Sequence, residues 1–127
     1  MTALIAGLGC RRGVSVEALT GIVTMALHQA SQRQRDLVLL AAPAFKEDAP
    51  FAMAASRLGV ALVYVDQPAL AEVQDRCLTK SPVTERLIGL GAIAEAAALA
   101  AAGPGAKLLG PRIASDGVTC AIARRAP

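Results

Sequence analysis

The sequence predicts an α/β fold of three layers, in which helices cover both faces of a mixed, mostly parallel sheet of about five strands. Short apolar runs at residues 3–7, 37–41 and 60–65 are typical of buried strands. Segments with helical periodicity separate these runs, and such alternation predicts parallel strands joined by right-handed crossovers. Two further runs, at residues 107–113 and 118–123, flank a Ser-Asp-Gly turn, so the chain is expected to end in an antiparallel hairpin.

The first two helices have recognisable start signals. Ser15 can cap the first helix, and Glu17 in its first turn is favourably placed against the helix dipole. Asp48 is expected to cap the second helix, with Pro50 tolerated inside its first turn. Gly59 is expected to end that helix.

The third helix is expected to open at Pro68 and to carry Leu70, Val73 and Cys77 on its apolar side. A fourth helix is predicted from about residue 93 to residue 102, where alanine dominates the sequence.

Length and composition favour one domain spanning residues 1–127, with a core of Ala, Leu, Val and Ile. The chain has two Phe, one Tyr and no Trp, which suits close packing of helices on a sheet and disfavours base stacking. Its net charge of +3 comes from paired arginines rather than a dense basic stripe. We therefore expect a small polyanionic ligand and no nucleic-acid partner.

The cysteines disfavour a disulfide framework or a zinc site, because Cys10, Cys77 and Cys120 are widely spaced and form no C-x-x-C pair. No metal site is expected. The start of the chain lacks the basic region and cleavage site of a signal peptide. The alanine-rich stretch at residues 92–102 is shorter than the ~20 apolar residues of a membrane span and contains Glu95. A cytoplasmic protein without a membrane partner is expected.

The start of the chain is the most informative stretch, because an apolar run leads into three glycines, Arg11, Arg12 and the capping Ser15. The pattern predicts a buried strand that delivers a flexible basic loop to a helix N-terminus, where backbone N–H groups favour anions. The sixth place of the dinucleotide fingerprint is Arg12 rather than glycine, and no Gly-Lys-Ser/Thr ending follows, so a nucleotide cofactor is disfavoured. The alternative to an anion-binding loop is a tight strand-to-helix turn whose two arginines are simply solvated.

Several basic side chains should meet at one edge of the sheet. In open α/β sheets, ligands bind outside the carboxyl ends of the strands. The loops after the parallel strands should emerge there, so Arg11 and Arg12 are expected to converge with Lys46. Glu47 and Asp48 beside Lys46 would temper the positive charge and accept hydrogen bonds from ligand amides or protonated groups.

Several motifs carry a family resemblance along essentially the whole chain. They are the Gly-Cys-Arg-Arg-Gly block at residues 9–13, Phe45-Lys46 with the acidic stretch after it, Ser81 with Val83, the Ala-Glu-Ala-Ala-Ala-Leu stretch at 94–99, and Gly-Val-Thr-Cys-Ala-Ile-Ala-Arg at 117–124. In these motifs the chain resembles the CobE family of cobalamin biosynthesis, which is similar to the C-terminal domain of the cobalt-precorrin hydrolase CbiG. It departs from the family pattern in the order of residues 47–50 and in Arg112, where a lysine is more typical.

The resemblance implies a role in building the corrin ring, and corrin precursors are flat apolar plates rimmed with carboxylates. Cobalt would then arrive only inside a bound corrinoid, and no separate cofactor is expected. Glu95 fits a ligand contact and a dipole-complementing role equally well. The residues expected at the ligand site are Gly9, Cys10, Arg11, Arg12, Gly13, Ser15, Lys46, Glu47, Asp48, Ser81 and Glu95.

Three function classes remain open: binding or delivery of a corrinoid or precorrin intermediate, hydrolysis of the lactone of a cobalt-precorrin intermediate, and docking on other cobalamin-pathway enzymes. Cys10 and Ser15 are the candidate nucleophiles for a hydrolase. The chain has a single histidine, His28, which lies late in the first predicted helix, roughly 20 Å from the helix start. Because the general base is missing, binding is the favoured interpretation.

Overall fold

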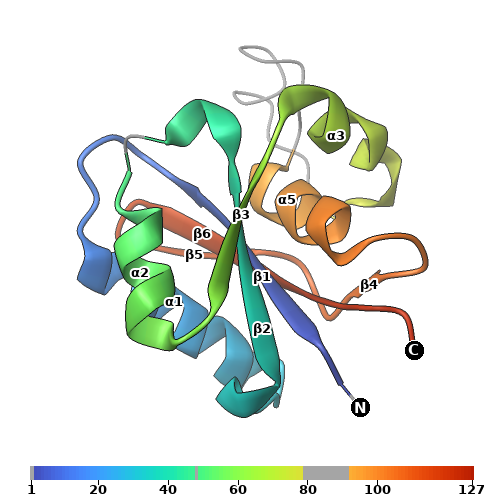
Figure 1. Ribbon diagram of the computed structural model, residues 1–127, viewed down its shortest axis with the longest axis horizontal. Coiled ribbons are helices and arrows are strands. Elements are labelled where there is room, and N and C mark those ends of the chain that lie inside the picture. The colour runs from blue at the N-terminus through green and yellow to red at the C-terminus, as the bar shows by residue number, and fades with distance from the viewer. Residues whose placement is uncertain (1, 48, 79–91) are drawn as a thin grey trace.

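The computed structural model describes residues 2–47, 49–78 and 92–127, so Asp48 and Ser81 lie outside the described residues. Figure 1 shows a twisted sheet with helices on both sides. In chain order the elements are β1 (Leu4–Cys10), α1 (Val16–Gln29), η1 (Gln34–Asp36), β2 (Leu37–Pro43), η2 (Ala44–Lys46), α2 (Phe51–Leu58), β3 (Ala61–Val65), α3 (Gln67–Glu72), η3 (Gln74–Arg76), α5 (Ile93–Ala102), β4 (Lys107–Leu108), β5 (Ile113–Ser115) and β6 (Val118–Arg124).

The sheet is mixed, as the sequence predicts, and it has six strands where about five were expected. Its order is β3-β2-β1-β6-β4, with β5 paired to β6. The first three strands are parallel to one another, while β6 runs antiparallel to its neighbours β1, β4 and β5. Five strands therefore point in one direction and β6 alone points in the other.

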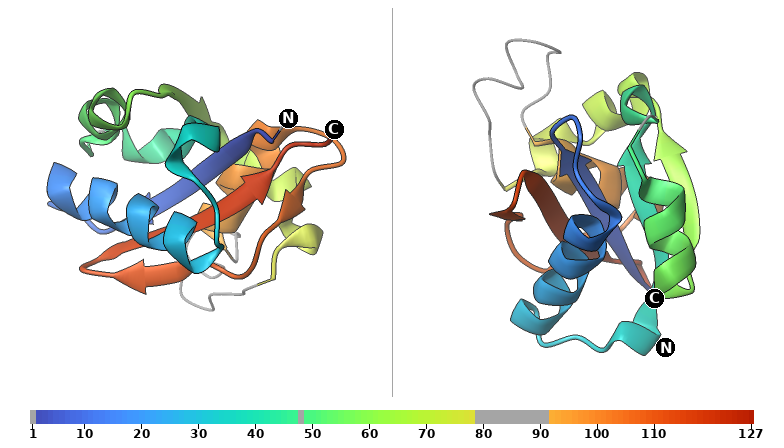
Figure 2. Two further views of the ribbon diagram at one scale, coloured as in Figure 1. Left: turned by 90° about the horizontal axis from the view of Figure 1, so that it is seen from below. Right: turned by 90° about the vertical axis from the view of Figure 1, so that its left-hand side faces the viewer.

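Helices cover both faces of the sheet, which confirms the three layers. One core cluster joins α1 and α2 to the side chains of Leu4 and Leu8. The other joins α3 and α5 to Ile5 and Ala41. The alternation of Leu4, Ile5 and Leu8 between the two clusters is the period of two that a strand buried on both faces must show. Figure 2 shows the two helix pairs on opposite sides of the strands.

The strand β1 continues to Cys10, so the expectation that Gly9 and Cys10 belong to a flexible loop is wrong. Helix α5 packs directly on this strand. A Cβ built on Gly7 would run into the carbonyl oxygen of Ala94 and lie 2.6 Å from the backbone nitrogen of Ala98. Gly7 therefore permits close packing of a helix backbone on the strand rather than flexibility.

The C-terminal hairpin exists, but its first strand is shorter than expected. The predicted strand over residues 107–113 is interrupted by Gly110, at φ 138°, and by Pro111, which has no N–H to offer a ladder. The result is two short strands, β4 and β5, that both pair with β6. Asp116 and Gly117 form the turn with φ values of 53° and 80°, as a two-residue hairpin turn requires.

Two helix boundaries differ from the prediction. Helix α2 has Pro50 at its N-cap position without a side-chain cap, rather than a proline inside the first turn. Helix α3 is capped by the Asp66 side chain, which accepts the Ala69 N–H at 3.0 Å. It ends at Glu72, so Cys77 lies beyond the helix in which the apolar spacing had placed it.

The packing of α5 on β1 predicts that Gly7→Ala destabilises the protein by about 3 kcal/mol, because the added methyl group must push two backbones apart. Gly21→Ala is the matched control, since Gly21 lies in α1 with open space around it. It should stabilise the protein by about 1 kcal/mol, because alanine is the better helix former. Urea unfolding of both variants measures these changes. Equal unfolding free energies for the two variants would contradict the packing.

Candidate ligand-binding site

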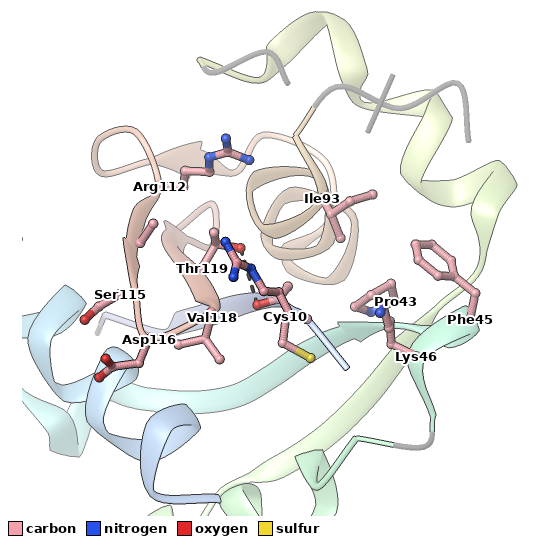
Figure 3. A pocket seen from close by; sticks show the side chains of 14 residues that line it. Cys10, Pro43, Phe45, Lys46, Ile93, Arg112, Ser115, Asp116, Val118 and Thr119 are labelled. Atoms are coloured by element: carbon pink, nitrogen blue, oxygen red, sulfur yellow. Dashed lines mark hydrogen bonds between the residues drawn. The ribbon is translucent and has the colours of Figure 1, made fainter. Parts of the chain in front are cut away.

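A cavity of about 710 Å³ opens at the edge of the sheet where β1 and β2 end. Its volume lies within the range of roughly 300–1,000 Å³ that small-molecule sites occupy. Four parts of the chain enclose it, as Figure 3 shows: the end of β1, the β2–η2 connection, the first turn of α5 and the β5–β6 hairpin.

Three cationic side chains line this cavity, each from a different part of the chain. Arg11 follows β1, Lys46 ends η2 after β2, and Arg112 precedes β5. The structure thus brings Arg11 and Lys46 to one cavity, as the sequence led us to expect. Arg12 instead lines a neighbouring hollow of about 700 Å³, which it shares with Arg11.

The rest of the cavity wall is largely apolar. Its apolar side chains are Pro43, Phe45, Ile93, Ala114 and Val118. Phe45 is 46% exposed even though it is one of the two phenylalanines in the chain. An exposed aromatic ring beside cationic groups suits a ligand that has an apolar face and an acidic rim.

The other predicted loop residues have varied surroundings. Gly9 and Cys10 line the main cavity, whereas Gly13 and Ser15 line the neighbouring hollow. Ser15 Oγ accepts the Ala18 N–H at 3.1 Å, so its role as helix cap is confirmed. Glu47 is exposed and does not line the main cavity.

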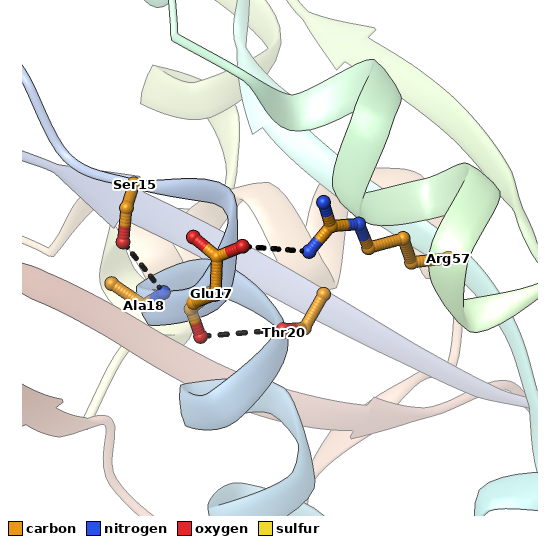
Figure 4. Close-up of polar contacts among 5 residues, drawn as sticks. All are labelled: Ser15, Glu17, Ala18, Thr20 and Arg57. Atoms are coloured by element: carbon orange, nitrogen blue, oxygen red, sulfur yellow. Dashed lines mark hydrogen bonds and ion pairs between the residues drawn. The ribbon is translucent and has the colours of Figure 1, made fainter.

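Glu17 lines the neighbouring hollow and forms an ion pair that joins α1 to α2. Its Oε2 accepts a hydrogen bond from Nη1 of Arg57 at 2.9 Å (Figure 4). The hydrogen bond from Arg57 holds the pKa of the Glu17 carboxyl below its ordinary value. Because both side chains are largely exposed, the pair adds little to stability.

Glu95 is fully buried in the first turn of α5, so its carboxylate is not exposed to the cavity. Its Oε1 accepts the backbone N–H of Leu78 and its Oε2 accepts that of Arg112, both at 2.8 Å. Hydrogen bonds to a charged group each contribute about 1.5–3 kcal/mol. The side chain therefore ties two connecting segments to α5.

Comparison with known proteins identifies the family. Residues 4–123 match the family model "Cobalamin synthesis G C-terminus" (CbiG_C). Protein CobE of Sinorhizobium sp is 31% identical over 121 residues, which cover 94% of this chain and 79% of that protein. This chain belongs to the CobE/CbiG C-terminal family of cobalamin biosynthesis proteins.

Solved structures of similar proteins agree with this membership. The crystal structure of CobE, a protein from the cobalamin (vitamin B12) biosynthetic pathway, matches with a TM-score of 0.91 and 35% identity, over 98% of this chain and 92% of that chain. Cobalamin biosynthesis protein chiG from Agrobacterium tumefaciens matches with a TM-score of 0.79 and 35% identity, over 98% of this chain and all of that chain. A cobalamin biosynthesis protein G homologue from Sulfolobus solfataricus shares the fold at 22% identity and a TM-score of 0.77, and this chain spans 37% of its length.

Sequence reasoning missed one wall of the cavity in this CobE-family protein. Arg112 and the hairpin residues from Ala114 to Thr119 line the cavity beside the expected loops. The reason is the direction of β6: because it runs antiparallel to β1, it begins at the edge where β1 ends, and Cys10 pairs with Val118. The backbone N–H of Arg11 extends this pairing by donating to the Gly117 carbonyl at 2.8 Å. In the sequence, the Asp116-Gly117 turn was the sign that a hairpin forms at this point of the chain.

The described residues place the histidine of the chain far along α1 from the cavity that Cys10 lines. Cys10 is partly buried and lines the cavity, but His28 lies exposed near the far end of α1.

Within residues 2–47, 49–78 and 92–127, no three His, Cys, Asp or Glu side chains gather where they could hold a metal ion. None of the helices in this described part has the length and apolar character that a membrane crossing requires.

The burial of Cys120 predicts that its thiol does not react in the folded protein. The side chain is 1% exposed, and this burial raises the pKa of the thiol far above its ordinary value, so the nucleophilic thiolate is absent at neutral pH. Cys10, which lines the open cavity, should react with an alkylating reagent at pH 8 while Cys120 does not. Peptide mass analysis before and after denaturation measures both sites. Alkylation of Cys120 at equal rates in folded and denatured protein would contradict this expectation.

Proposed function

We propose that this CobE-family protein binds a polycarboxylate corrinoid or precorrin intermediate and holds or delivers it during cobalamin biosynthesis. The observation that carries the proposal is the single cavity in which Arg11, Lys46 and Arg112 surround a largely apolar wall. Family membership gives the biosynthetic context, and the chemistry of the cavity gives the ligand class.

The two chemical parts of a corrin precursor, its apolar ring and its acidic arms, match the apolar side chains and the cations of the cavity. A corrin precursor presents a broad apolar ring, which would lie against apolar side chains such as Phe45, Ile93 and Val118. Its acetate and propionate arms would accept hydrogen bonds from the cations. Arginine can grip a carboxylate with two parallel N–H groups, whereas Lys46 acts as a compact point charge.

Arg11 and Arg12 differ in what they line, because Arg11 lines both the main cavity and the neighbouring hollow. Arg12 lines only the second of these. A macrocycle with several acidic arms would place one arm in each hollow, with Arg11 contacting both. Arg11 should therefore contribute more to binding than Arg12.

Binding is favoured over lactone hydrolysis by what surrounds the candidate nucleophiles. The Ser15 Oγ accepts a hydrogen bond as the cap of α1, and the first turn of α1 contains no histidine. Cys10 lines the cavity, but the one histidine of the chain lies in the last turn of α1, many residues along the helix. Acyl hydrolysis by a Cys–His pair needs the thiol and the imidazole within hydrogen-bond reach of each other. Asp116 is the carboxylate that lines the cavity together with Cys10.

The proposal predicts that cobyrinic acid, a corrin whose arms are all carboxylates, changes its visible spectrum when titrated with the pure protein. Cobinamide, which has the same ring with amidated arms, should bind at least tenfold more weakly, because it cannot form the charged contacts. Added NaCl should weaken the binding of cobyrinic acid and leave that of cobinamide nearly unchanged. An unchanged cobyrinic acid spectrum at micromolar protein would sink the proposal.

The proposal also predicts how much each alanine variant of the arginines weakens the binding of cobyrinic acid. Arg11→Ala should weaken cobyrinic acid binding by about fivefold, since an exposed charge pair contributes up to about 1 kcal/mol and each 1.4 kcal/mol is tenfold. Arg12→Ala should weaken it less. Arg125→Ala is the matched control, because Arg125 follows β6 at the opposite edge of the sheet. Equal losses for Arg11→Ala and Arg125→Ala would show that only net charge matters.

A further inference from the structure

The third cation of the cavity stands on irregular backbone. Arg112 lies between β4 and β5, just after Gly110 and Pro111, and outside both strands. Leu109 secures the start of this connection by donating its N–H to the Ile122 carbonyl at 2.9 Å. Pairing with β6 resumes only at Ile113, so over residues 110–112 the sheet does not fix the path, and the direction in which Arg112 enters the cavity needs another anchor.

The anchor is Glu95. Its Oε2 accepts the backbone N–H of Arg112 at 2.8 Å, and its Oε1 accepts that of Leu78 at the same distance. The carboxylate is fully buried, where an ionised group must be hydrogen-bonded to persist. It therefore fixes the position of the Arg112 backbone much more strongly than an exposed acid would.

The helix that carries Glu95 is itself rigidly placed. The first turns of α5 lie on β1 at Gly7, so closely that a methyl group does not fit between them. The same first turn contributes Ile93 to the cavity wall. One turn of helix thus supplies part of the apolar wall and also holds the segment that brings a cation to it.

We propose that Glu95 is a positioning residue: it orients the backbone at Arg112 so that the guanidinium lies across the cavity from Lys46. Arg112 precedes β5 on one side of β1, whereas Lys46 follows β2 on the other side, and Figure 3 shows them at opposite ends of the cavity. Two cations separated in this way select a ligand with acidic arms on both sides of its ring. This inference rests on the proposed corrinoid binding.

A double-mutant cycle with cobyrinic acid tests whether Glu95 acts through Arg112. Glu95→Gln keeps the size of the side chain but turns an amide NH₂ toward one of the two N–H donors. It should weaken binding about as much as Arg112→Ala does, by roughly fivefold. In the Arg112→Ala background it should cause no further loss, whereas with Lys46→Ala the two losses should multiply. An equal loss from Glu95→Gln with and without Arg112 would overturn the proposal.

Glu72→Gln is the matched control for the charge change, because Glu72 is an exposed acid at the end of α3. It should bind cobyrinic acid as the unaltered protein does. A loss equal to that of Glu95→Gln would show that net charge, and not the buried anchor, decides the affinity.

Amide hydrogen exchange tests the anchor without any ligand. In the unaltered protein, the amides of Leu78 and Arg112 should exchange as slowly as those of the core strands, although both residues lie outside helices and strands. Fast exchange at Arg112 would overturn the proposal even if Glu95→Gln does not fold. If cobyrinic acid does not bind the unaltered protein while Arg112 exchanges slowly, the corrinoid function fails and the anchor stands.

Discussion

The contact on which the rest of the structure depends is the approach of α5 to β1 at Gly7. A helix backbone can lie this close to a strand only where the strand has no side chain, and a Cβ at Gly7 would meet backbone atoms of Ala94 and Ala98. The alanines of α5 keep the layer thin along the rest of the helix. Because the first turn of α5 is fixed in this way, Ile93 reaches the cavity and Glu95 reaches the backbone of Arg112.

The antiparallel strand β6 brings the second half of the site to the same edge of the sheet. In an all-parallel sheet, ligand-binding loops come only from the carboxyl ends of strands. Here β6 begins beside the end of β1, so the Asp116-Gly117 turn becomes a wall of the cavity. The hydrogen bond from Arg11 to Gly117 joins the basic loop to this turn. The site is therefore shared between the two ends of the chain, which explains why it needs the whole fold.

The cations of the cavity come from three separate connections, and apolar side chains from β2, η2, α5, β5 and β6 lie among them. Cations spread over several connections suit a flat ligand with several acidic arms better than a compact anion, which would need its cations close together. Membership of the CobE/CbiG C-terminal family is consistent with this chemistry, since its relatives are cobalamin biosynthesis proteins.

The sequence by itself determined the three layers, the parallel strands β1 to β3, the cap at Ser15 and the shared location of Arg11 and Lys46. These follow from local periodicity and from the rule that parallel strands end at one edge. Only the tertiary structure decided the roles of Gly7, Arg112 and Glu95, because each depends on contacts between segments far apart in the chain. The sequence does not distinguish a glycine that permits close packing, such as Gly7, from a glycine in a loop. It likewise does not distinguish a buried glutamate that accepts backbone N–H groups, such as Glu95, from one that binds a ligand.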